Sequence, residues 1–152
     1  MFLEGCEIVL GSFPTDMLPR SVTQSGLVII NADPHTEKGT HWLAVHCLSK
    51  SSSAYFFDSY GIVPLVPDVA AFIRRNCTVW DYNRRQLRGL TSNICGKYCC
   101  VFALYMDRGF TAKQFVGQFD GASPADRQIV RAFASEFGSP RRCDGSGGVG
   151  GQ

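Results

Sequence analysis

The chain has 152 residues, a formal net charge of +2, 45% hydrophobic residues and 18% charged residues. These values are typical of one globular domain with a substantial core. They are not typical of a dedicated nucleic-acid-binding protein, so we expect weak or no nucleic-acid binding. No apolar run reaches the length of about 18 residues that predicts a membrane span. The first residues, MFLEGCEIVLG, lack the basic start of a secretory signal peptide. We therefore expect neither a membrane partner nor secretion.

The seven cysteines indicate a reducing, intracellular compartment. Their number is odd, several lie in apolar runs, and no secretion signal accompanies them. The sequence contains no CxxC pair, and its three histidines do not lie at ligand spacing to one. We therefore expect that the protein requires neither a metal nor a small-molecule cofactor.

Hydrophobic periodicity and turn residues predict the elements in chain order. Strands are expected at residues 7–10, 26–31, 40–48, 54–58 and 77–82, and the short connection at 49–53 predicts a hairpin. Helices are expected at residues 64–76, 111–117 and 123–137, with a central helix that begins near Cys95. Because strands precede the central helix and helices follow it, we expect an α+β fold with a mainly antiparallel central sheet.

The end of the chain differs in composition from the rest. Residues 144–152, DGSGGVGGQ, are rich in glycine, and we expect them to form a disordered tail. Residues 1–143 contain no internal repeat. We expect them to form a single domain.

Residues 86–106 pass from a polar, turn-rich start into an apolar run, which predicts the beginning of a buried helix. Ser92 or Asn93 can cap this helix, which places Cys95 in its first turn. There the unpaired N–H groups and the helix dipole favour a thiolate, the nucleophilic form of cysteine. Cys99 and Cys100 lie one turn further in, where thiols are usually inert. The alternative is that Cys95 only packs in the core, which is the commoner role of a buried cysteine near a helix start.

The predicted hairpin carries a second pair of candidate residues. His41 begins one strand and Asp58 lies near the end of the next, so an antiparallel hairpin brings them to the same end of the sheet. Their side chains share a face if His41 pairs with residue 58 or 60, and a shift by one residue separates them. A carboxylate there would orient the imidazole and stabilise its positive charge. The alternative is a histidine at the rim of the sheet beside a turn aspartate.

The loop before the central helix contains candidates for a further role. Acyl transfer through a thiolate requires two donors for the developing oxyanion, and the Cys95 backbone N–H is one of them. Gln86 can be the second, with Asn83 as the nearest substitute, although a lone glutamine is usually solvated. Gly96 allows another segment to approach the helix closely. The basic patch of this loop is interpreted as solvated surface: Arg84, Arg85 and Arg88.

The order of these motifs resembles the adenovirus-type cysteine proteases (adenain), which are related to the ubiquitin-like-protein-processing proteases. The matching segments are GLVIINADPHTEKGTHWLAV, FFDSYG and NICGKYCCVF, with the glutamine between the last two. The resemblance implies a papain-like arrangement in which the central helix faces the sheet. It implies the roles of general base, orienting acid, oxyanion donor and nucleophile for His41, Asp58, Gln86 and Cys95. It also implies a narrow substrate groove at Trp42 and Gly96 that favours glycine.

Several features depart from that family. Nine positions separate Gln86 from Cys95, slightly more than the family has, and the acid is Asp58 where adenovirus members carry glutamate. We expect no counterpart of the amino-terminal helix of the adenovirus enzymes or of much of their carboxy-terminal extension. These departures indicate a compact member from another virus or from a virus-derived mobile element, acting in the host nucleus or cytoplasm or within the virion.

The resemblance also implies a possible activating viral peptide. In adenovirus enzymes such a peptide adds a strand to the sheet and can be held by a disulfide. Cys77, at the start of the predicted strand 77–82, is the candidate for this tether, provided that it is accessible beside an open strand edge. The alternative is a half-buried strand residue without such a role.

The sequence thus predicts a cysteine endopeptidase that cleaves viral precursor proteins, preferentially after glycine. An isopeptidase that acts on ubiquitin or a ubiquitin-like protein is the first alternative, with the same catalytic residues. A catalytically silent structural or DNA-binding virion protein is the alternative from another class.

Overall fold

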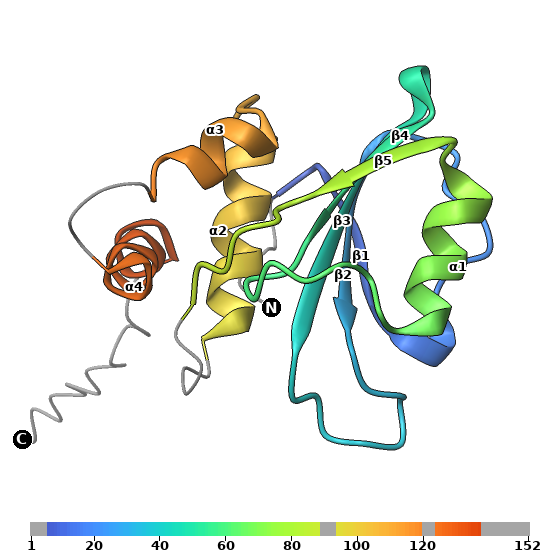
Figure 1. Ribbon diagram of the computed structural model, residues 1–152, viewed down its shortest axis with the longest axis horizontal. Coiled ribbons are helices and arrows are strands. Elements are labelled where there is room, and N and C mark those ends of the chain that lie inside the picture. Colours follow the sequence, from blue (N-terminus) through green and yellow to red (C-terminus); the bar gives the residue numbers. More distant parts are fainter. Residues whose placement is uncertain (1–5, 89–93, 120–123, 138–152) are drawn as a thin grey trace, which may run out of the picture.

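A five-stranded sheet with helices on both faces forms the centre of the structure (Figure 1). The computed structural model describes residues 6–88, 94–119 and 124–137. The strands are β1 (Val9–Pro14), β2 (Gly26–Asn31), β3 (Trp42–Leu48), β4 (Ser53–Phe57) and β5 (Val79–Tyr82). The α-helices are α1 (Pro67–Asn76), α2 (Cys95–Asp107), α3 (Ala112–Gly117) and α4 (Ala125–Phe137), and two short 3-10 turns lie at Thr15–Met17 and Ser49–Ser51. The expected α+β architecture is confirmed.

The strand order in the sheet follows the chain, but the sheet is mixed rather than mainly antiparallel. The pairs β2–β3 and β3–β4 are antiparallel, whereas β1–β2 and β4–β5 are parallel. The expectation of a mainly antiparallel sheet is therefore wrong. The reason lies in the connections: the segment between β4 and β5 contains α1 and is long enough to return the chain for a parallel strand.

Both faces of the sheet are buried, which explains the continuous apolar run of β2. Leu27 and Ile29 pack in the core beneath α2, and Val28 and Ile30 pack in the core beneath α1. A strand that is covered on both sides has no reason to alternate polar with apolar residues. Figure 1 shows α1 on one face of the sheet and α2, together with α3 and α4, on the other.

Aromatic packing positions α2 against the sheet. The ring of Phe102 stacks on that of Phe57, with centroids 4.6 Å apart, and meets the ring of Phe115 from α3 edge-on at 5.3 Å. All three side chains are fully buried. Offset and edge-to-face ring pairs add to the stabilisation that burial itself provides. This packing fixes the position of α2 relative to β4.

Several element boundaries follow from local chemistry. Helix α1 begins with Pro67, whose fixed φ suits the first helical position. Helix α3 begins with a capping box of Thr111 and Gln114. Strand β1 runs on to Pro14 instead of ending at residue 10, because an edge strand tolerates a terminal proline. The predicted caps Ser92 and Asn93 and the predicted tail at 144–152 lie outside the described residues.

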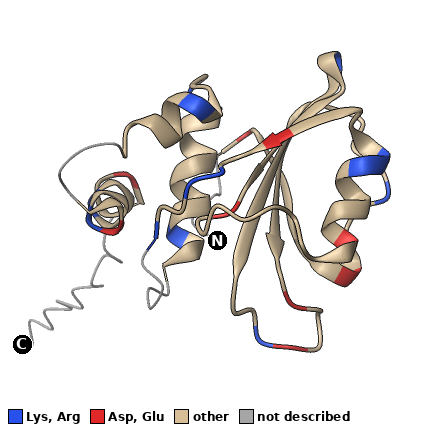
Figure 2. Ribbon diagram, in the orientation of Figure 1, with Lys and Arg blue, Asp and Glu red and all other residues tan. Residues whose placement is uncertain are grey.

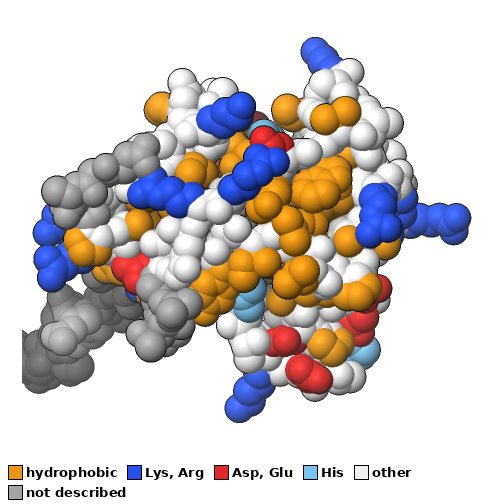
Figure 3. Space-filling view, in the orientation of Figure 1, with side chains coloured by type: hydrophobic (Ala, Val, Ile, Leu, Met, Phe, Trp, Pro, Cys, Tyr) orange, Lys and Arg blue, Asp and Glu red, His pale blue; other side chains and the backbone are white. Residues whose placement is uncertain are grey.

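Basic residues are spread around the molecule, whereas exposed hydrophobic side chains gather on one region of it (Figure 2 and Figure 3). Basic residues lie on α1, α3, α4 and the segment that follows β5, so that they are spread around the molecule (Figure 2). Figure 3 shows hydrophobic side chains gathered over the region of β5. Val79 and Trp80 on β5 are exposed hydrophobic residues. No helix among the described residues is long and apolar enough to cross a membrane.

Candidate active site

Three element ends bring the principal candidate residues together. His41 immediately precedes β3, Asp58 immediately follows β4, and Cys95 is the first residue of α2. The His41 Nε2 atom lies 2.9 Å from the Asp58 Oδ1 atom. His41 lies just outside the strand that it was expected to begin.

The register of the hairpin explains the contact between His41 and Asp58. Ala44 pairs with Phe57 at the end of the β3–β4 ladder. Continued by three residues, this register places His41 opposite Tyr60, one of the two alternatives that the hypothesis required. The two rings are neighbours, with centroids 5.1 Å apart. His41 and Asp58 therefore belong to the same face of the hairpin, as diagonal neighbours.

Asp58 is held in place by its own loop and by β5. It is 7% exposed, and its Oδ1 atom also accepts a hydrogen bond from the Tyr60 backbone N–H at 2.8 Å. Asn83, which follows β5 and is 2% exposed, accepts from the Asp58 N–H at 3.0 Å and donates to the Asp58 carbonyl. The Asn83 amide, the nearest substitute for Gln86 in the sequence, is thus engaged with Asp58.

The contact with Asp58 determines which His41 nitrogen is available for chemistry. An ionised carboxylate only accepts hydrogen bonds, so the Nε2 atom carries the proton in the neutral ring. The Nδ1 atom then carries the lone pair. It is buried and has no hydrogen-bond partner among the described residues. The imidazole is therefore oriented as a base whose free nitrogen does not face solvent.

The Cys95 thiol lies beside this imidazole and is 3% exposed. Its Sγ atom is 3.9 Å from the Thr40 carbonyl oxygen. Burial raises the pKa of Cys95, but the polar interaction with His41, the Trp42 backbone N–H and the positive charges of His41 and Arg88 lower it. The lowering effects prevail, so the pKa of the thiol is below its ordinary value. The site therefore favours a thiolate.

The pKa of His41 changes in the complementary direction. Burial lowers it, whereas the hydrogen bond to Asp58 and the interaction and charge of Cys95 raise it, with a net result of about 9. The lowered pKa of the cysteine and the raised pKa of the histidine both favour a thiolate–imidazolium pair. This pair can attack a carbonyl carbon and then deliver a proton to the leaving group.

The other cysteines that the structure describes do not share this environment. Burial raises the pKa of each of them: Cys6, Cys47, Cys77, Cys99 and Cys100. Cys99 is 1% exposed and lies in the core cluster beneath α2. The hypothesis that Cys99 and Cys100 are inert packing residues agrees with this environment.

The loop that contains Gln86 lies against the turn after β4. The N–H groups of Leu87 and Arg88 donate to the Ser59 carbonyl at 2.9 and 3.2 Å. Gly61 has a φ of +70°, and a Cβ atom there would lie 2.3 Å from the Arg85 carbonyl carbon. Only glycine satisfies both conditions. This requirement explains the glycine of the segment FFDSYG.

Gln86 itself is exposed, and its Nε2 atom donates to the Arg88 carbonyl oxygen at 2.8 Å. This bond holds the Gln86 amide within its own loop.

Trp42 and Gly96 lie together, since a Cβ atom on Gly96 would be in ordinary contact with Trp42 Cδ1 at 3.5 Å. Gly96 thus lies directly against the Trp42 ring.

The environment of Arg88 differs from the one that the sequence predicted. It was expected in a solvated basic patch, but it is 6% exposed. Its guanidinium lies over the Tyr60 ring, 3.7 Å from the centroid. Its Nε and Nη1 atoms are buried and have no hydrogen-bond partner within residues 6–88, 94–119 and 124–137. Arg84 and Arg85 are exposed, and nothing in the local sequence separates Arg88 from them.

Cys77 does not have the environment that a disulfide tether requires. It follows α1 as its C-terminal cap, two residues before β5, and it is 7% exposed. It packs in the core beneath α1, where its thiol interacts with Cys47. The β5 edge is the end of the sheet, as expected, but the accessible thiol is not present. The expectation of a tether at Cys77 is therefore wrong.

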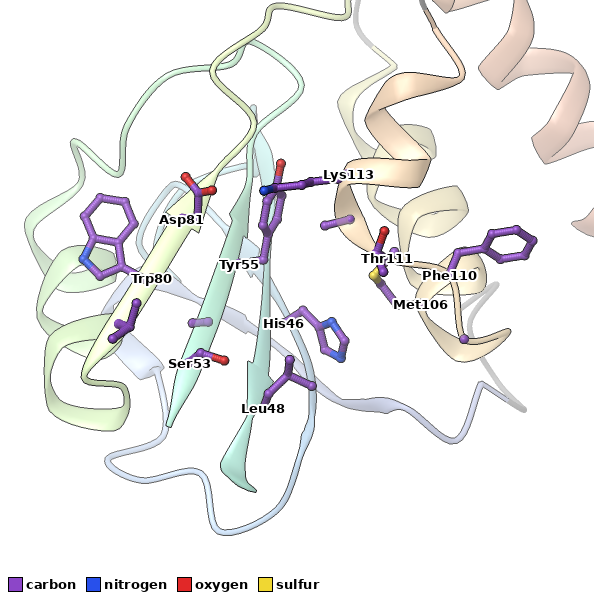
Figure 4. Close-up of a pocket in the computed structure, with 14 residues that line it drawn as sticks. His46, Leu48, Ser53, Tyr55, Trp80, Asp81, Met106, Phe110, Thr111 and Lys113 are labelled. Atoms are coloured by element: carbon purple, nitrogen blue, oxygen red, sulfur yellow. The ribbon is translucent and has the colours of Figure 1, made fainter. Parts of the chain in front are cut away.

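A separate cavity lies at the far ends of β3 and α2. Its volume is about 500 Å³, and apolar side chains such as Leu48, Trp80 and Phe110 form much of its wall. Figure 4 shows His46 and Met106 in this cavity, between the sheet and the turn before α3. Burial lowers the pKa of His46. The lining residues include none of the three candidate residues His41, Asp58 and Cys95.

Within the described ranges, no group of three or more His, Cys, Asp or Glu residues could hold a metal ion. His41 and Asp58 are paired with each other, and the Cys95 thiol lies beside His41. The arrangement can therefore perform thiolate chemistry with its own side chains.

Comparisons with known proteins give a match in structure. No family model and no curated protein sequence matches the chain. Two crystal structures of the ASFV pS273R protease, one of them of the Se-Met protein, superpose with TM-scores of 0.55 and 0.56 at 17% and 16% sequence identity. Each match covers 75% of this chain, but only 44% and 43% of the protease chains, so this chain spans less than half of their length. The chain has the fold of part of that viral protease.

Proposed function

We propose that this protein is a cysteine endopeptidase of the adenain-like type. Its nucleophile is Cys95, its general base is His41, and Asp58 orients the imidazole. The observation that carries the proposal is the 2.9 Å contact between His41 and Asp58, with the thiol of Cys95 beside the same ring at the start of a buried helix. The likeness to the fold of a viral protease supports it.

The reaction follows from this geometry. The Cys95 thiolate attacks the carbonyl carbon of the scissile peptide bond, so that a C–S bond forms and the carbonyl electrons move to oxygen. The tetrahedral intermediate collapses as the C–N bond breaks, and the His41 imidazolium donates its proton to the departing amine. His41, now neutral, accepts a proton from the water that hydrolyses the thioester. Asp58 stabilises the imidazolium without itself being protonated.

The oxyanion requires two hydrogen-bond donors. The backbone N–H of Cys95, at the beginning of α2, is the first. The loop between β5 and α2 provides the second, and it contains both Gln86, which the resemblance assigns, and Arg88. A substrate that approaches along this loop also meets the Trp42 ring and Gly96, whose contact favours a small residue such as glycine before the cleaved bond.

The proposed substrates are precursor proteins of a virus or a virus-derived element, and the proposed location is the host nucleus or cytoplasm, or the virion. Because Cys77 is buried, an activating peptide would bind without a covalent link. β5 is the last strand of the sheet, and Val79 on it is 65% exposed. Its open edge is suited to the addition of a strand.

Fluorogenic peptides that end in Gly-Gly test this function directly. We expect hydrolysis by the wild-type protein and by the control variant Cys100→Ser, and none by Cys95→Ser, because Cys100 lies further along the same helix with a raised pKa. Iodoacetamide should modify Cys95 first among the cysteines. Hydrolysis by Cys95→Ser at the wild-type rate would refute the assignment.

The same catalytic residues would serve an isopeptidase, so the substrate decides between these two functions. A ubiquitin-based activity probe forms a covalent adduct with the nucleophile only if the protein also binds the folded ubiquitin. We expect the peptides to react and the probe not to react. The reverse result would favour the isopeptidase, and retention of Cys95 reactivity without any hydrolysis would favour a silent virion protein.

A further inference from the structure

A buried cation without complete hydrogen bonding lies beside the candidate active site. Arg88 is 6% exposed, and its Nε and Nη1 atoms have no partner in the part of the chain that the structure describes. Burying a charged group with unsatisfied donors destabilises a protein, so such a group in a folded structure calls for a functional explanation. The two N–H donors are therefore available for a ligand.

One ring contact and the reach of its charge place this cation near the reacting groups. The guanidinium lies 3.7 Å from the centroid of Tyr60, and Tyr60 contacts the His41 ring. The positive charge of Arg88 also acts on Cys95 and on Tyr98, one turn further along α2. The donors thus lie between the turn after β4 and the start of α2.

Two hydrogen bonds hold the backbone of Arg88 in place. Its N–H donates to the Ser59 carbonyl, and its own carbonyl accepts from the Gln86 side chain. Gln86 is exposed, so its amide stabilises the loop from the outside while Arg88 points inward. Arg88 is also two residues nearer to Cys95 in the sequence than Gln86.

We propose that Arg88, rather than Gln86, donates the second hydrogen bond to the oxyanion. This inference rests on the proposed function. When the Cys95 thiolate adds to the scissile carbonyl, the carbonyl π electrons become a negative charge on oxygen, and the guanidinium Nε–H or Nη1–H donates to it. Gln86 is a positioning residue that acts through the Arg88 carbonyl. A cationic donor with little access to water stabilises such a charge more than a neutral amide does.

Kinetics of Arg88→Met and Gln86→Ala test the assignment. We expect Arg88→Met to lower kcat by about 10²–10³-fold, as loss of one oxyanion donor does, with little change in KM. Gln86→Ala should lower kcat much less, because the backbone bonds to Ser59 remain. Arg88→Lys, which keeps the charge but loses the Nε–H and Nη1–H geometry, should recover only part of the rate.

Two reagents separate a donor to the oxyanion from a charge that only acidifies the thiol. A peptide aldehyde reacts with Cys95 to form a tetrahedral adduct that carries the former carbonyl oxygen, so Arg88→Met should weaken its inhibition in parallel with kcat. Iodoacetamide forms a C–S bond and releases iodide without any oxyanion. The limiting rate at which iodoacetamide alkylates Cys95 at high pH should therefore be the same in Arg88→Met as in the wild type. The pH at which this limit is reached can differ between them.

The outcomes distinguish the two proposals. If the wild type hydrolyses the peptides, two results overturn this inference alone. One is an Arg88→Met variant with the full wild-type kcat, and the other is a large loss of kcat in Gln86→Ala but not in Arg88→Met. A parallel loss of kcat and of the limiting alkylation rate also overturns it, since Arg88 would then act on the thiol or the fold. Absence of hydrolysis by the wild type overturns both proposals. If circular dichroism shows that Arg88→Met is unfolded, Arg88→Lys and Arg88→Gln decide by the same criteria.

Discussion

The replacement Asp58→Asn removes one negative charge from the site and preserves most of its shape. The Asp58 Oδ1 atom accepts from both His41 and the Tyr60 N–H, and an asparagine Oδ1 atom can accept the same two bonds. Asn83 continues to hold the backbone at this position. The variant therefore tests the charge of the carboxylate rather than the position of the ring.

The expected effect is a shift of the alkaline limit of activity. The imidazolium of His41 persists up to its pKa of about 9, against an ordinary value of 6.5, and Asp58 is a principal cause of this increase. Loss of an opposite charge at such a distance lowers a pKa by about 1–3 units. The alkaline limb of kcat/KM should therefore move down from about pH 9 by that amount. The acid limb should move up, because a weaker imidazolium stabilises the Cys95 thiolate less.

The pH dependence of kcat/KM and of the iodoacetamide reaction measures both limits. Asp81→Asn is the matched control, since this carboxylate lies on β5 and pairs with Arg84. It should leave the profile unchanged. An Asp58→Asn profile that coincides with the wild-type profile would refute the argument that the carboxylate sets the His41 pKa.

Three further predictions concern the packing around the site. Gly61→Ala should lower the free energy of unfolding in urea by more than the roughly 1 kcal/mol of left-handed strain, because its Cβ would also meet the Arg85 backbone. Gly109→Ala, with a φ of +85° and no atom within 4 Å, is the control, and equal losses would contradict the steric argument. Phe102→Ala should lower that free energy by about 3–5 kcal/mol, as for other fully buried aromatic residues, and a loss below 1 kcal/mol would contradict the packing role assigned to it. Cys77→Ser should leave kcat/KM unchanged, whereas loss of activation by an added viral peptide would restore the tether hypothesis.

The sequence was sufficient for the features that depend on neighbours along the chain. The apolar run at residues 26–31 predicted a strand, which is present as β2. The polar start before an apolar run located the beginning of α2 at Cys95. The short helix predicted at residues 111–117 is present as α3, which begins after Thr111. Helix caps, turns and periodicity are local effects, so a single sequence records them.

The sequence limited, but did not determine, the strand register that brings His41 and Asp58 together. It limited the productive registers to a pairing of His41 with residue 58 or 60, but the alternation of the strand was compatible with other registers. The packing of β3 between β2 and β4 selected the register that places His41 opposite Tyr60. The contact of the two side chains is a consequence of that selection.

The remaining features were decided by tertiary structure alone. Arg88 and Arg84 belong to the same basic segment, yet one is buried over Tyr60 and the other is exposed. The tether hypothesis required Cys77 to be accessible beside a strand edge, and the residue instead lies in the core beneath α1. The parallel pairing of β4 with β5 depends on the path of α1 across the sheet. In each case the environment of a residue is created by segments distant in the chain, and burial and charge pairing depend on that environment rather than on the residue's neighbours in sequence.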